Sequence, residues 1–516
     1  MQRRFVVLVS CLFLLFAAAV SAEVKPSALF SDHMVLQSGM TVPVWGTASP
    51  GEVVKVTLNG QSQTATAGPD GKWMVRLGKL KAGGPWEMRI EGKNTITVKD
   101  VLVGEVWVGS GQSNMAFTVS KKAAPYAGML DEEKEIAAAN HPTIRMFTVK
   151  ERKAYTPQDD VAGEWKICSP ETVPGFSAVG YLFARDLQAK LNVPVGILTV
   201  AYGASTAEAW VPREAVAADP QMKPMLDKFD ALEEFFKTHP GAKNEDAPPG
   251  PQTLNARPPR PGPFRDPVQD QHEPTVLFNG MLHSVIPYAI RGAIWYQGES
   301  ITGGKAGLAL YPYVMETMVT QWRALWGEGD FPFYAVQLPA LKNVSNNPLV
   351  REGQARILSL PNSGLAVTID VGDPDNVHPK NKAPVGERLM LIAMANVYGR
   401  KLEYSGPRYK SMKVKGNAIR IGFTHVDGGL AAKDGPLKWF QIAGDDHQFV
   451  DAEATITGKT VIVKSDKVAK PAAVRYAWDN YPIGCNLFNA AGLPAAPFRT
   501  DAWDAMTKIA EEFTGK

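Results

Sequence analysis

The sequence predicts an α/β protein built on a parallel sheet, with accessory sandwich-like β-regions at both ends. Between residues 101 and 404, apolar runs typical of buried strands alternate with segments whose apolar residues have helical spacing. Short alternating runs separated by turn residues fill residues 23–100 and 405–490 instead. The central region therefore predicts the α/β domain, and the flanking regions predict β-structure.

The first 22 residues have the pattern of a secretory signal peptide. A basic start at Gln2–Arg4 precedes the apolar run Phe5–Val20, and Val20–Ala22 forms a small-residue cleavage site. No later segment reaches the roughly 18 apolar residues that a membrane span needs. We therefore expect a secreted or periplasmic protein without a membrane span.

The charge of the chain bears on the kinds of partner that it could bind. The 516 residues carry a formal net charge of only +3, and two of the positive charges lie in the expected signal peptide. This balance gives no support for a nucleic-acid or anionic-membrane partner, and the scattered Lys and Arg side chains are expected on the surface. Outside the signal peptide, Cys168 and Cys485 could form one disulfide or remain two buried thiols. Nothing in the sequence indicates an oligomeric state.

The N-terminal β-domain is expected over residues 23–100. Its strand candidates are separated by turn signals such as Asn59-Gly60 and Pro69-Asp70-Gly71. Several short strands with frequent turns favour a sandwich. The candidates are Thr41–Val44, Val53–Leu58 and Trp73–Leu77.

The central domain is expected over residues 101–404, with a Pro-rich surface insertion at 240–274, and a β-rich region follows at 405–516. The central strand candidates are Val101–Val108, Val195–Tyr202, Ala289–Ile294, Phe333–Leu338 and 364–371. The helix candidates are Phe176–Leu191, Tyr311–Trp326 and Gly386–Gly399.

A candidate nucleophile follows the first central strand. Ser113 lies in Gly-Gln-Ser-Asn-Met directly after Val101–Val108. A serine at a strand-to-helix turn projects its hydroxyl beyond the carboxyl edge of the sheet, and the free N–H groups of the following helix can stabilise an oxyanion. The alternative is that Ser113 is an ordinary helix N-cap.

A candidate base follows the last central strand. A serine hydroxyl needs a positioned base, and a third group must orient that base. Asp375 and His378 are three residues apart in Asp-Pro-Asp-Asn-Val-His-Pro, so they could share one side of a turn. Alternatively the segment is a surface turn, or Asp373, Asp375 and His378 bind a metal. His283 is the only rival base.

Two further polar clusters follow central strands. Gln297 and Glu299 lie in Trp-Tyr-Gln-Gly-Glu-Ser, where Gln297 could donate to an oxyanion and Glu299 would need a partner. Gly203, after Val195–Tyr202, would allow close backbone approach to a substrate. Each cluster could also be a plain loop. Because all four clusters follow strands of one parallel sheet, we expect them to meet at its carboxyl edge.

These residues resemble the sialate O-acetylesterase family of SGNH-type hydrolases. The resemblance is carried by the Gly-Gln-Ser-Asn-Met, Trp-Tyr-Gln-Gly-Glu-Ser and Asp-Asn-Val-His-Pro blocks. It is also carried by Gly104–Trp107, Met34–Gln37, Phe176–Tyr181, Arg351–Gln354 and Asn486–Pro494, so it extends over almost the whole chain after the signal peptide.

The resemblance implies roles for individual residues. Ser113 would be the nucleophile, His378 the base and Asp375 its orienting acid. The oxyanion hole would comprise the N–H of Ser113 together with Gly203 and Gln297. The resemblance also implies that Glu299, Arg351 and Glu352 lie near the substrate pocket, without implying their roles. Further pocket candidates within the motifs are Gln112, Asn114 and Gly298.

This chain departs from the family pattern at two places. It has Tyr202-Gly203-Ala204 where Gly-Gly-Thr is expected, and Ile301 follows Ser300 where Asn or Asp is more usual. The first departure keeps one glycine for the oxyanion hole but alters the pocket beside Tyr202.

The expected activity is removal of O-acetyl groups from sialic acid or a related acetylated sugar or glycan, through an acetyl-serine and without cofactor or metal. The alternatives are an esterase acting on acetyl-xylan or another plant polysaccharide, a metal-dependent hydrolase, and a non-catalytic carbohydrate-binding protein.

Overall fold

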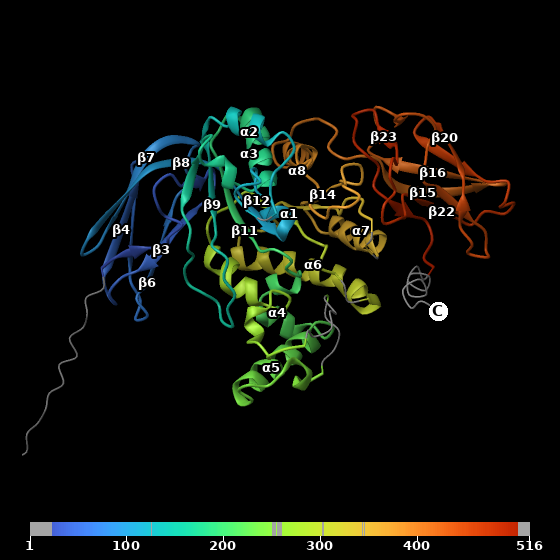
Figure 1. Ribbon diagram of the computed structural model, residues 1–516. Helices are drawn as coiled ribbons and strands as arrows, with labels where there is room; N and C mark the ends of the chain where they lie inside the picture. The colour runs from blue at the N-terminus through green and yellow to red at the C-terminus, as the bar shows by residue number, and fades with distance from the viewer. Residues whose placement is uncertain are drawn as a thin grey trace, which may run out of the picture.

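The computed structural model describes residues 23–503, except 125, 250–253, 255–260, 302–303, 343 and 345. An N-terminal β-region, a central α/β region and a C-terminal β-region follow one another across the molecule (Figure 1). The expected signal peptide at residues 1–22 lies outside the described residues.

The centre of the molecule is a parallel sheet with strand order β9-β11-β8-β12-β13-β14, and β10 pairs antiparallel with β9 at one edge. Its strands are almost entirely buried, as expected for a parallel sheet covered on both faces. Their bounds are β8 Thr95–Gly111, β9 His141–Thr148, β10 Trp165–Cys168, β11 Val195–Ala201, β12 Gly292–Tyr296, β13 Phe333–Val336 and β14 Ser363–Ala366. The predicted α/β class is confirmed.

Strand β8 is longer than the predicted Val101–Val108. Its first part pairs with β7 (Gly83–Glu91) and β2 (Val35–Gln37) of the N-terminal region, and its last part pairs with β11 and β12. Exposed and buried residues alternate at its start, whereas every residue from Val101 onwards is buried. The expected boundary between residues 100 and 101 therefore falls inside one strand that the two regions share.

Helices cover both faces of the sheet. On one face, α3 (Ala178–Leu191) and α8 (Ala383–Asn396) pack together, and Phe183 of α3 meets Trp107 of β8 with ring centroids 5.1 Å apart. On the other face, α6 (Gly304–Trp326) places Trp322 against Trp295 of β12 at 5.8 Å.

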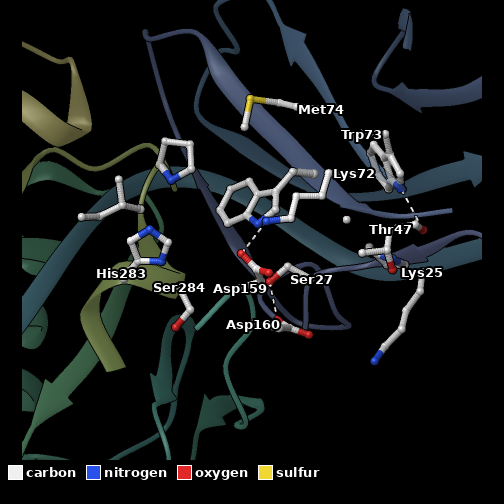
Figure 2. A pocket seen from close by; sticks show the side chains of 15 residues that line it. Lys25, Ser27, Thr47, Lys72, Trp73, Met74, Asp159, Asp160, His283 and Ser284 are labelled. Carbon is white, nitrogen blue, oxygen red and sulfur yellow. Dashed lines mark hydrogen bonds and ion pairs between the residues drawn. The ribbon is translucent and has the colours of Figure 1, made fainter. Parts of the chain in front are cut away.

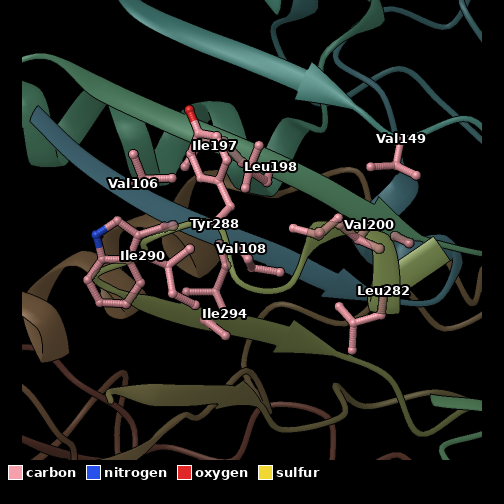
Figure 3. Close-up of a cluster of buried hydrophobic side chains, with 14 of the residues drawn as sticks. Val106, Val108, Val149, Ile197, Leu198, Val200, Leu282, Tyr288, Ile290 and Ile294 are labelled. Atoms are coloured by element: carbon pink, nitrogen blue, oxygen red, sulfur yellow. The ribbon is translucent and has the colours of Figure 1, made fainter. Parts of the chain in front are cut away.

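Aliphatic side chains join these aromatic rings in the core around the central strands. Figure 3 shows Val106 and Val108 of β8, Ile197 and Val200 of β11 and Ile294 of β12, which lie on the two faces of the sheet. All five are essentially inaccessible to solvent. This packing fixes the register of the strands whose ends carry the predicted site.

The two flanking regions are β-structure, as predicted, and apart from the parallel pairing of β2 with β8 their strands pair antiparallel. The remaining N-terminal strands are β1 Lys25–Pro26, β3 Val42–Thr47, β4 Val53–Leu58, β5 Gln61–Thr66 and β6 Lys72–Leu77. The C-terminal strands are β15 Arg408–Lys415, β16 Ala418–Thr424, β17 Leu430–Ala432, β18 Phe440–Ala443, β19 Val450–Asp451, β20 Glu453–Thr457, β21 Thr460–Lys464, β22 Ala473–Tyr476, β23 Leu487–Asn489 and β24 Phe498–Arg499.

The remaining helices lie in connections. Two of them, which the sequence did not indicate, precede the expected insertion: α4 (Arg213–Ala218) and α5 (Lys223–Thr238). The described parts of 240–274 contain only short 3-10 turns, at Asn244–Asp246 and Pro267–Gln269. The others are α1 Ser113–Ala116, α2 Glu132–Ala138 and α7 Asn347–Ala355, with short 3-10 or π turns at Val173–Gly175, Glu208–Trp210, Phe278–Leu282, His283–Val285 and Arg356–Ser359.

Two expectations concern single features of the chain. Cys168 and Cys485 are both free and buried, so the structure contains the two thiols rather than the disulfide. Within the described residues, none of the helices has the length and apolar character that crossing a bilayer requires.

Candidate active site

The candidate site lies at the carboxyl edge of the sheet where the strand order reverses. β8 comes first of these strands along the chain; β9, β10 and β11 lie on one side of it, and β12, β13 and β14 lie on the other side. Loops that leave neighbouring strands in opposite directions open a crevice at such a point, which is where open α/β sheets bind ligands. The predicted clusters after β8, β11, β12 and β14 all reach this edge.

The turn that presents Ser113 depends on a glycine. Gly111, the last residue of β8, has φ +133°, and a Cβ there would lie 2.2 Å from the carbonyl oxygen of Tyr296. The chain then pairs once more with β12, because the N–H of Gln112 donates to that carbonyl at 2.9 Å. Helix α1 begins at the next residue, so the hydroxyl of Ser113 projects from the junction between strand and helix.

The structure brings together Ser113 and His378, which are 265 positions apart. Oγ of Ser113 and Nε2 of His378 are 2.7 Å apart, which is hydrogen-bonding distance for a nucleophile and its base. Burial, with a smaller contribution from the charge of Lys382, lowers the pKa of the imidazole to about 4. His378 is therefore neutral at neutral pH, the state in which it can accept a proton.

Asp375 does not contact the imidazole. It is exposed, its N–H donates to Asp373 Oδ1 at 3.0 Å, and no hydrogen bond joins its carboxylate to His378 in the described chain. Asn376 supports the loop at this point, because its Oδ1 accepts from the backbone N–H of His378 at 2.9 Å. The sequence analysis expected the Asp375 carboxylate to contact the His378 imidazole. In the structure Asp375 lies on the same loop, but its side chain is exposed on the surface.

The three expected oxyanion donors converge on the same edge. The backbone N–H groups of Ser113 and Gly203 have no acceptor within the described part of the chain. The side chain of Gln297 is fully buried, and its Nε2 donates to the carbonyl of Ser205 at 3.2 Å. That bond ties the loop after β12 to the loop after β11 and leaves one amide hydrogen of Gln297 for a further acceptor.

Two residues expected near the pocket form a buried network with a residue that sequence reasoning missed. Asn114 donates from Nδ2 to a carboxylate oxygen of Glu299 and, at 2.9 Å, to the carbonyl of Val377. Its Oδ1 accepts from Nζ of Lys382 at 2.5 Å. Burial raises the pKa of Glu299 and lowers the pKa of Lys382 to about 7. Lys382 was expected on the surface with the other lysines, and its spacing four residues after His378 was the only available signal.

Gln112 and Gly298 connect two of the loops at the site. Oε1 of Gln112 accepts from the N–H of Gly298 at 3.3 Å, and both residues are buried. The loop after β8 is thereby held against the loop after β12, directly beside Ser113.

Arg351 and Glu352 lie in a different environment from the one that the resemblance implied. Arg351 is 1% exposed, and its guanidinium donates to the carbonyls of Leu338, Pro339, Asp479 and Asn480. Glu352 pairs with Arg499 at 2.8 Å. Both residues therefore attach α7 to the C-terminal β-region, and Arg351 is interior rather than on a pocket wall.

The rival base lies elsewhere. His283 and Ser284 line a cavity of about 400 Å³ between the N-terminal β-region and the α/β region. Figure 2 shows these two residues in that cavity with the ion-paired Lys72 and Asp159. Neither Ser113 nor His378 is among the residues that line it. Among the described residues, no group of three or more His, Cys, Asp or Glu side chains has an arrangement that could hold a metal ion.

The fold and the site define the class of protein. A parallel sheet with a Ser–His pair at its carboxyl edge is consistent with an SGNH-like hydrolase. A crystal structure of a carbohydrate acetylesterase from Xanthomonas citri matches this chain with a TM-score of 0.79 and 35% identity, covering 93% of this chain and 100% of that one. The chain is therefore a carbohydrate esterase, a carboxylic-ester hydrolase.

Sequence comparisons narrow the class to a family. Residues 274–394 match the model of the carbohydrate esterases described as sialic acid-specific acetylesterases. The rat sialate O-acetylesterase is 29% identical, with 92% of this chain and 93% of the rat protein covered, and the human enzyme is 28% identical, with 92% and 91% covered. The chain belongs to the sialate O-acetylesterase family.

Proposed function

We propose that this protein is a serine esterase that removes O-acetyl groups from sialic acid or related acetylated sugars through an acetyl-serine intermediate. The observation that carries the proposal is the 2.7 Å contact between Ser113 Oγ and His378 Nε2 at the carboxyl edge of the sheet. Membership of the sialate O-acetylesterase family supports the same chemistry.

The reaction has two acyl-transfer steps. Oγ of Ser113 attacks the acetyl carbonyl carbon while Nε2 of His378 takes the hydroxyl proton. The N–H groups of Ser113 and Gly203, with the amide of Gln297, stabilise the oxyanion. The tetrahedral adduct collapses to acetyl-serine, and the imidazolium returns its proton to the departing sugar oxygen. Water then attacks the acetyl-serine by the same route and releases acetate.

Asp375 is proposed as the orienting acid of His378. No carboxylate forms a hydrogen bond with the imidazole in the described chain, and Asp375 lies on the same loop as His378. Formation of an imidazolium would attract its carboxylate toward Nδ1. This step requires a movement of the exposed side chain.

The substrate has two candidates. The animal relatives are named for sialate esters, whereas the solved relative with 35% identity is described as a carbohydrate acetylesterase without a named sugar. Acetyl-xylan or another acetylated plant polysaccharide is therefore the second candidate. Acetate release from 9-O-acetyl sialic acid and from acetyl-xylan, measured side by side, separates the two.

Ser113→Ala tests the nucleophile. We expect acetate release to fall by at least about 10³-fold, because a triad acts as a unit. Ser284→Ala is the matched control, since Ser284 is also a buried serine but lies outside the site. A fluorophosphonate should label the wild type and the control, but not Ser113→Ala, and a chelator should leave the wild-type rate unchanged. An active Ser113→Ala enzyme would refute the proposal.

We further propose that residues 1–22 are removed during export to the periplasm or the medium. The basic start, apolar run and small-residue site support this. N-terminal sequencing of the protein recovered after export should begin at Glu23, and retention of Met1 would contradict it.

A further inference from the structure

Lys382 is a buried lysine beside the catalytic pair, and the proposed reaction gives it no role. It is 1% exposed and lies immediately before α8. Its ammonium is 4.6 Å from the ring centroid of Phe117 and 5.4 Å from that of Tyr296. Moving an ammonium group out of water costs free energy unless polar partners compensate for the lost hydration. The partners of Lys382 therefore indicate why a lysine is held at this position.

The ammonium determines how the Asn114 amide is oriented. A lysine ammonium only donates, so the atom of Asn114 that faces Nζ at 2.5 Å must be the accepting oxygen. The amide nitrogen then points the other way, toward the Glu299 carboxylate and the Val377 carbonyl, both of which only accept. A reversed amide would place a donor against a donor and an acceptor against two acceptors.

The amide fixed in this way joins the neighbours of both reacting residues. Asn114 follows Ser113, and Val377 precedes His378. We propose that Lys382 is a positioning residue of the esterase, which holds Asn114 in the orientation that fastens the nucleophile turn to the backbone beside the base. The proposal rests on the serine mechanism given above.

The network also offsets its own charges. The Lys382 ammonium lowers the pKa of Glu299, and the carboxylate raises the pKa of Lys382, so each partly compensates the burial of the other. The ammonium also disfavours a positive charge on the nearby imidazole, which lowers the pKa of His378. The other polar or titratable groups around His378 are Ser113 at 2.7 Å, the ring of Tyr126 at 4.7 Å, and Asp373, Asp375 and Asn376 on its own loop.

Lys382→Met tests the proposal, because methionine fills the apolar part of the space without a charge or donor. We expect kcat to fall about ten- to a hundredfold with little change in KM, since a small misplacement of reacting groups costs this much. We also expect the acid limb of the kcat/KM profile to move to higher pH, because the imidazole loses a neighbouring positive charge. Lys380→Met is the matched control, since Lys380 is an exposed lysine on the same segment.

The double variant Lys382→Met/Glu299→Gln sharpens the test. Without Lys382 the buried Glu299 carboxylate has no nearby positive charge to compensate its burial, so the double variant should melt at a higher temperature than Lys382→Met. Its kcat should stay low, because the amide of Asn114 is still not held. Should Lys382→Met not fold, Glu299→Gln, which keeps the shape of the side chain, should lower kcat severalfold, and a wild-type kcat in that variant overturns the proposal.

The results for Lys382→Met and for Ser113→Ala distinguish a failure of the positioning role of Lys382 from a failure of the serine mechanism. A folded Lys382→Met enzyme with wild-type kcat and acid limb overturns it, as does a variant that only melts earlier while kcat per fluorophosphonate-labelled site is unchanged. If Ser113→Ala is inactive in the same assay, the serine mechanism stands despite either result. If Ser113→Ala is active, the serine mechanism is wrong, and the positioning role of Lys382, which rests on it, is wrong as well.

Discussion

The segment that carries Ser113 and the segment that carries His378 meet at the edge of the sheet. Only the Ser113 segment is part of the regular secondary structure. Ser113 is 6% exposed and lies two residues after the end of β8, a strand that is paired on both sides. His378 lies within residues 367–382, all of which the structure describes and none of which belongs to a helix or strand. The sheet therefore places Ser113, the proposed nucleophile, whereas His378, the proposed base, depends on side-chain contacts that hold its loop in place.

The difference predicts that the two segments break in different ways. Damage to the nucleophile segment should disturb the sheet and therefore folding. Damage to the base segment should leave the fold intact and lower the rate. The predictions below address one segment at a time, in order of decreasing effect.

Gly111→Ala should have the largest effect, because it introduces a side chain into the closely packed turn at the end of β8. The new Cβ would lie 2.2 Å from the Tyr296 carbonyl oxygen, at a φ of +133° that alanine rarely adopts. We expect a loss of at least about 3 kcal/mol in the free energy of unfolding, measured by denaturant titration, together with loss of activity. Gly399→Ala is the control, since its φ is also positive (+63°) but nothing lies within 4 Å of the added Cβ. Equal losses in the two variants would show that close packing at the turn is unimportant.

Asp375→Asn should have an intermediate effect confined to the rate. Loss of a buried carboxylate bonded to the catalytic histidine costs about 10⁴-fold in a well-studied triad. Because Asp375 is exposed and not bonded to His378 in this structure, we expect a smaller fall in kcat, of about ten- to a hundredfold. The melting temperature should not change.

Asp427→Asn, at a fully exposed side chain in the C-terminal β-region, is the control for that variant. A wild-type rate for Asp375→Asn would remove Asp375 from the reaction and leave a Ser–His dyad.

The sequence predicted the sheet and the meeting of Ser113 with His378 because both depend on local patterns. Strand-like apolar runs ended directly before Gly-Gln-Ser-Asn-Met and before the segment that contains His378. The rule that parallel strands share a carboxyl edge then brought the two together. The structure confirms this placement with the contact between Ser113 and His378.

The supports of the pair could not be predicted, because they depend on burial that no local pattern reveals. Lys382 looks like any other lysine in the sequence, and only the fold shows that it is enclosed by two aromatic rings. Conversely, Arg351 belongs to a family-like block, but its four carbonyl partners include two from the C-terminal region, which is far away in sequence. The full length of β8 was not predicted. Exposed and buried residues alternate at its start, whereas its end is continuously buried, so the sequence resembles two separate strands.

The pH dependence of the rate should report the neutral imidazole in the base segment. The pKa of His378 is lowered to about 4, mainly by burial, so the base keeps its ability to accept a proton well below neutral pH. Activity should fall as the pH drops through about 4, when the imidazole becomes protonated. A kcat/KM profile on a non-ionisable acetyl ester measures this limb, and a midpoint near 6.5 would show that the imidazole is solvated as in a free histidine.

Tyr126→Ala should have the smallest effect and concerns the outer side of the base. The Tyr126 ring lies over the imidazole at 4.7 Å between centroids, although the residue is 51% exposed. Removing the ring admits water to His378, and since burial is the main cause of its lowered pKa, the acid limb should move to higher pH, toward the ordinary value. The fold and the rate at neutral pH should change little, because the imidazole is neutral there in either case. If the limb stays in place, the inner side of His378, toward Ser113 and Lys382, supplies the burial, and the exposed tyrosine contributes nothing to the state of the base.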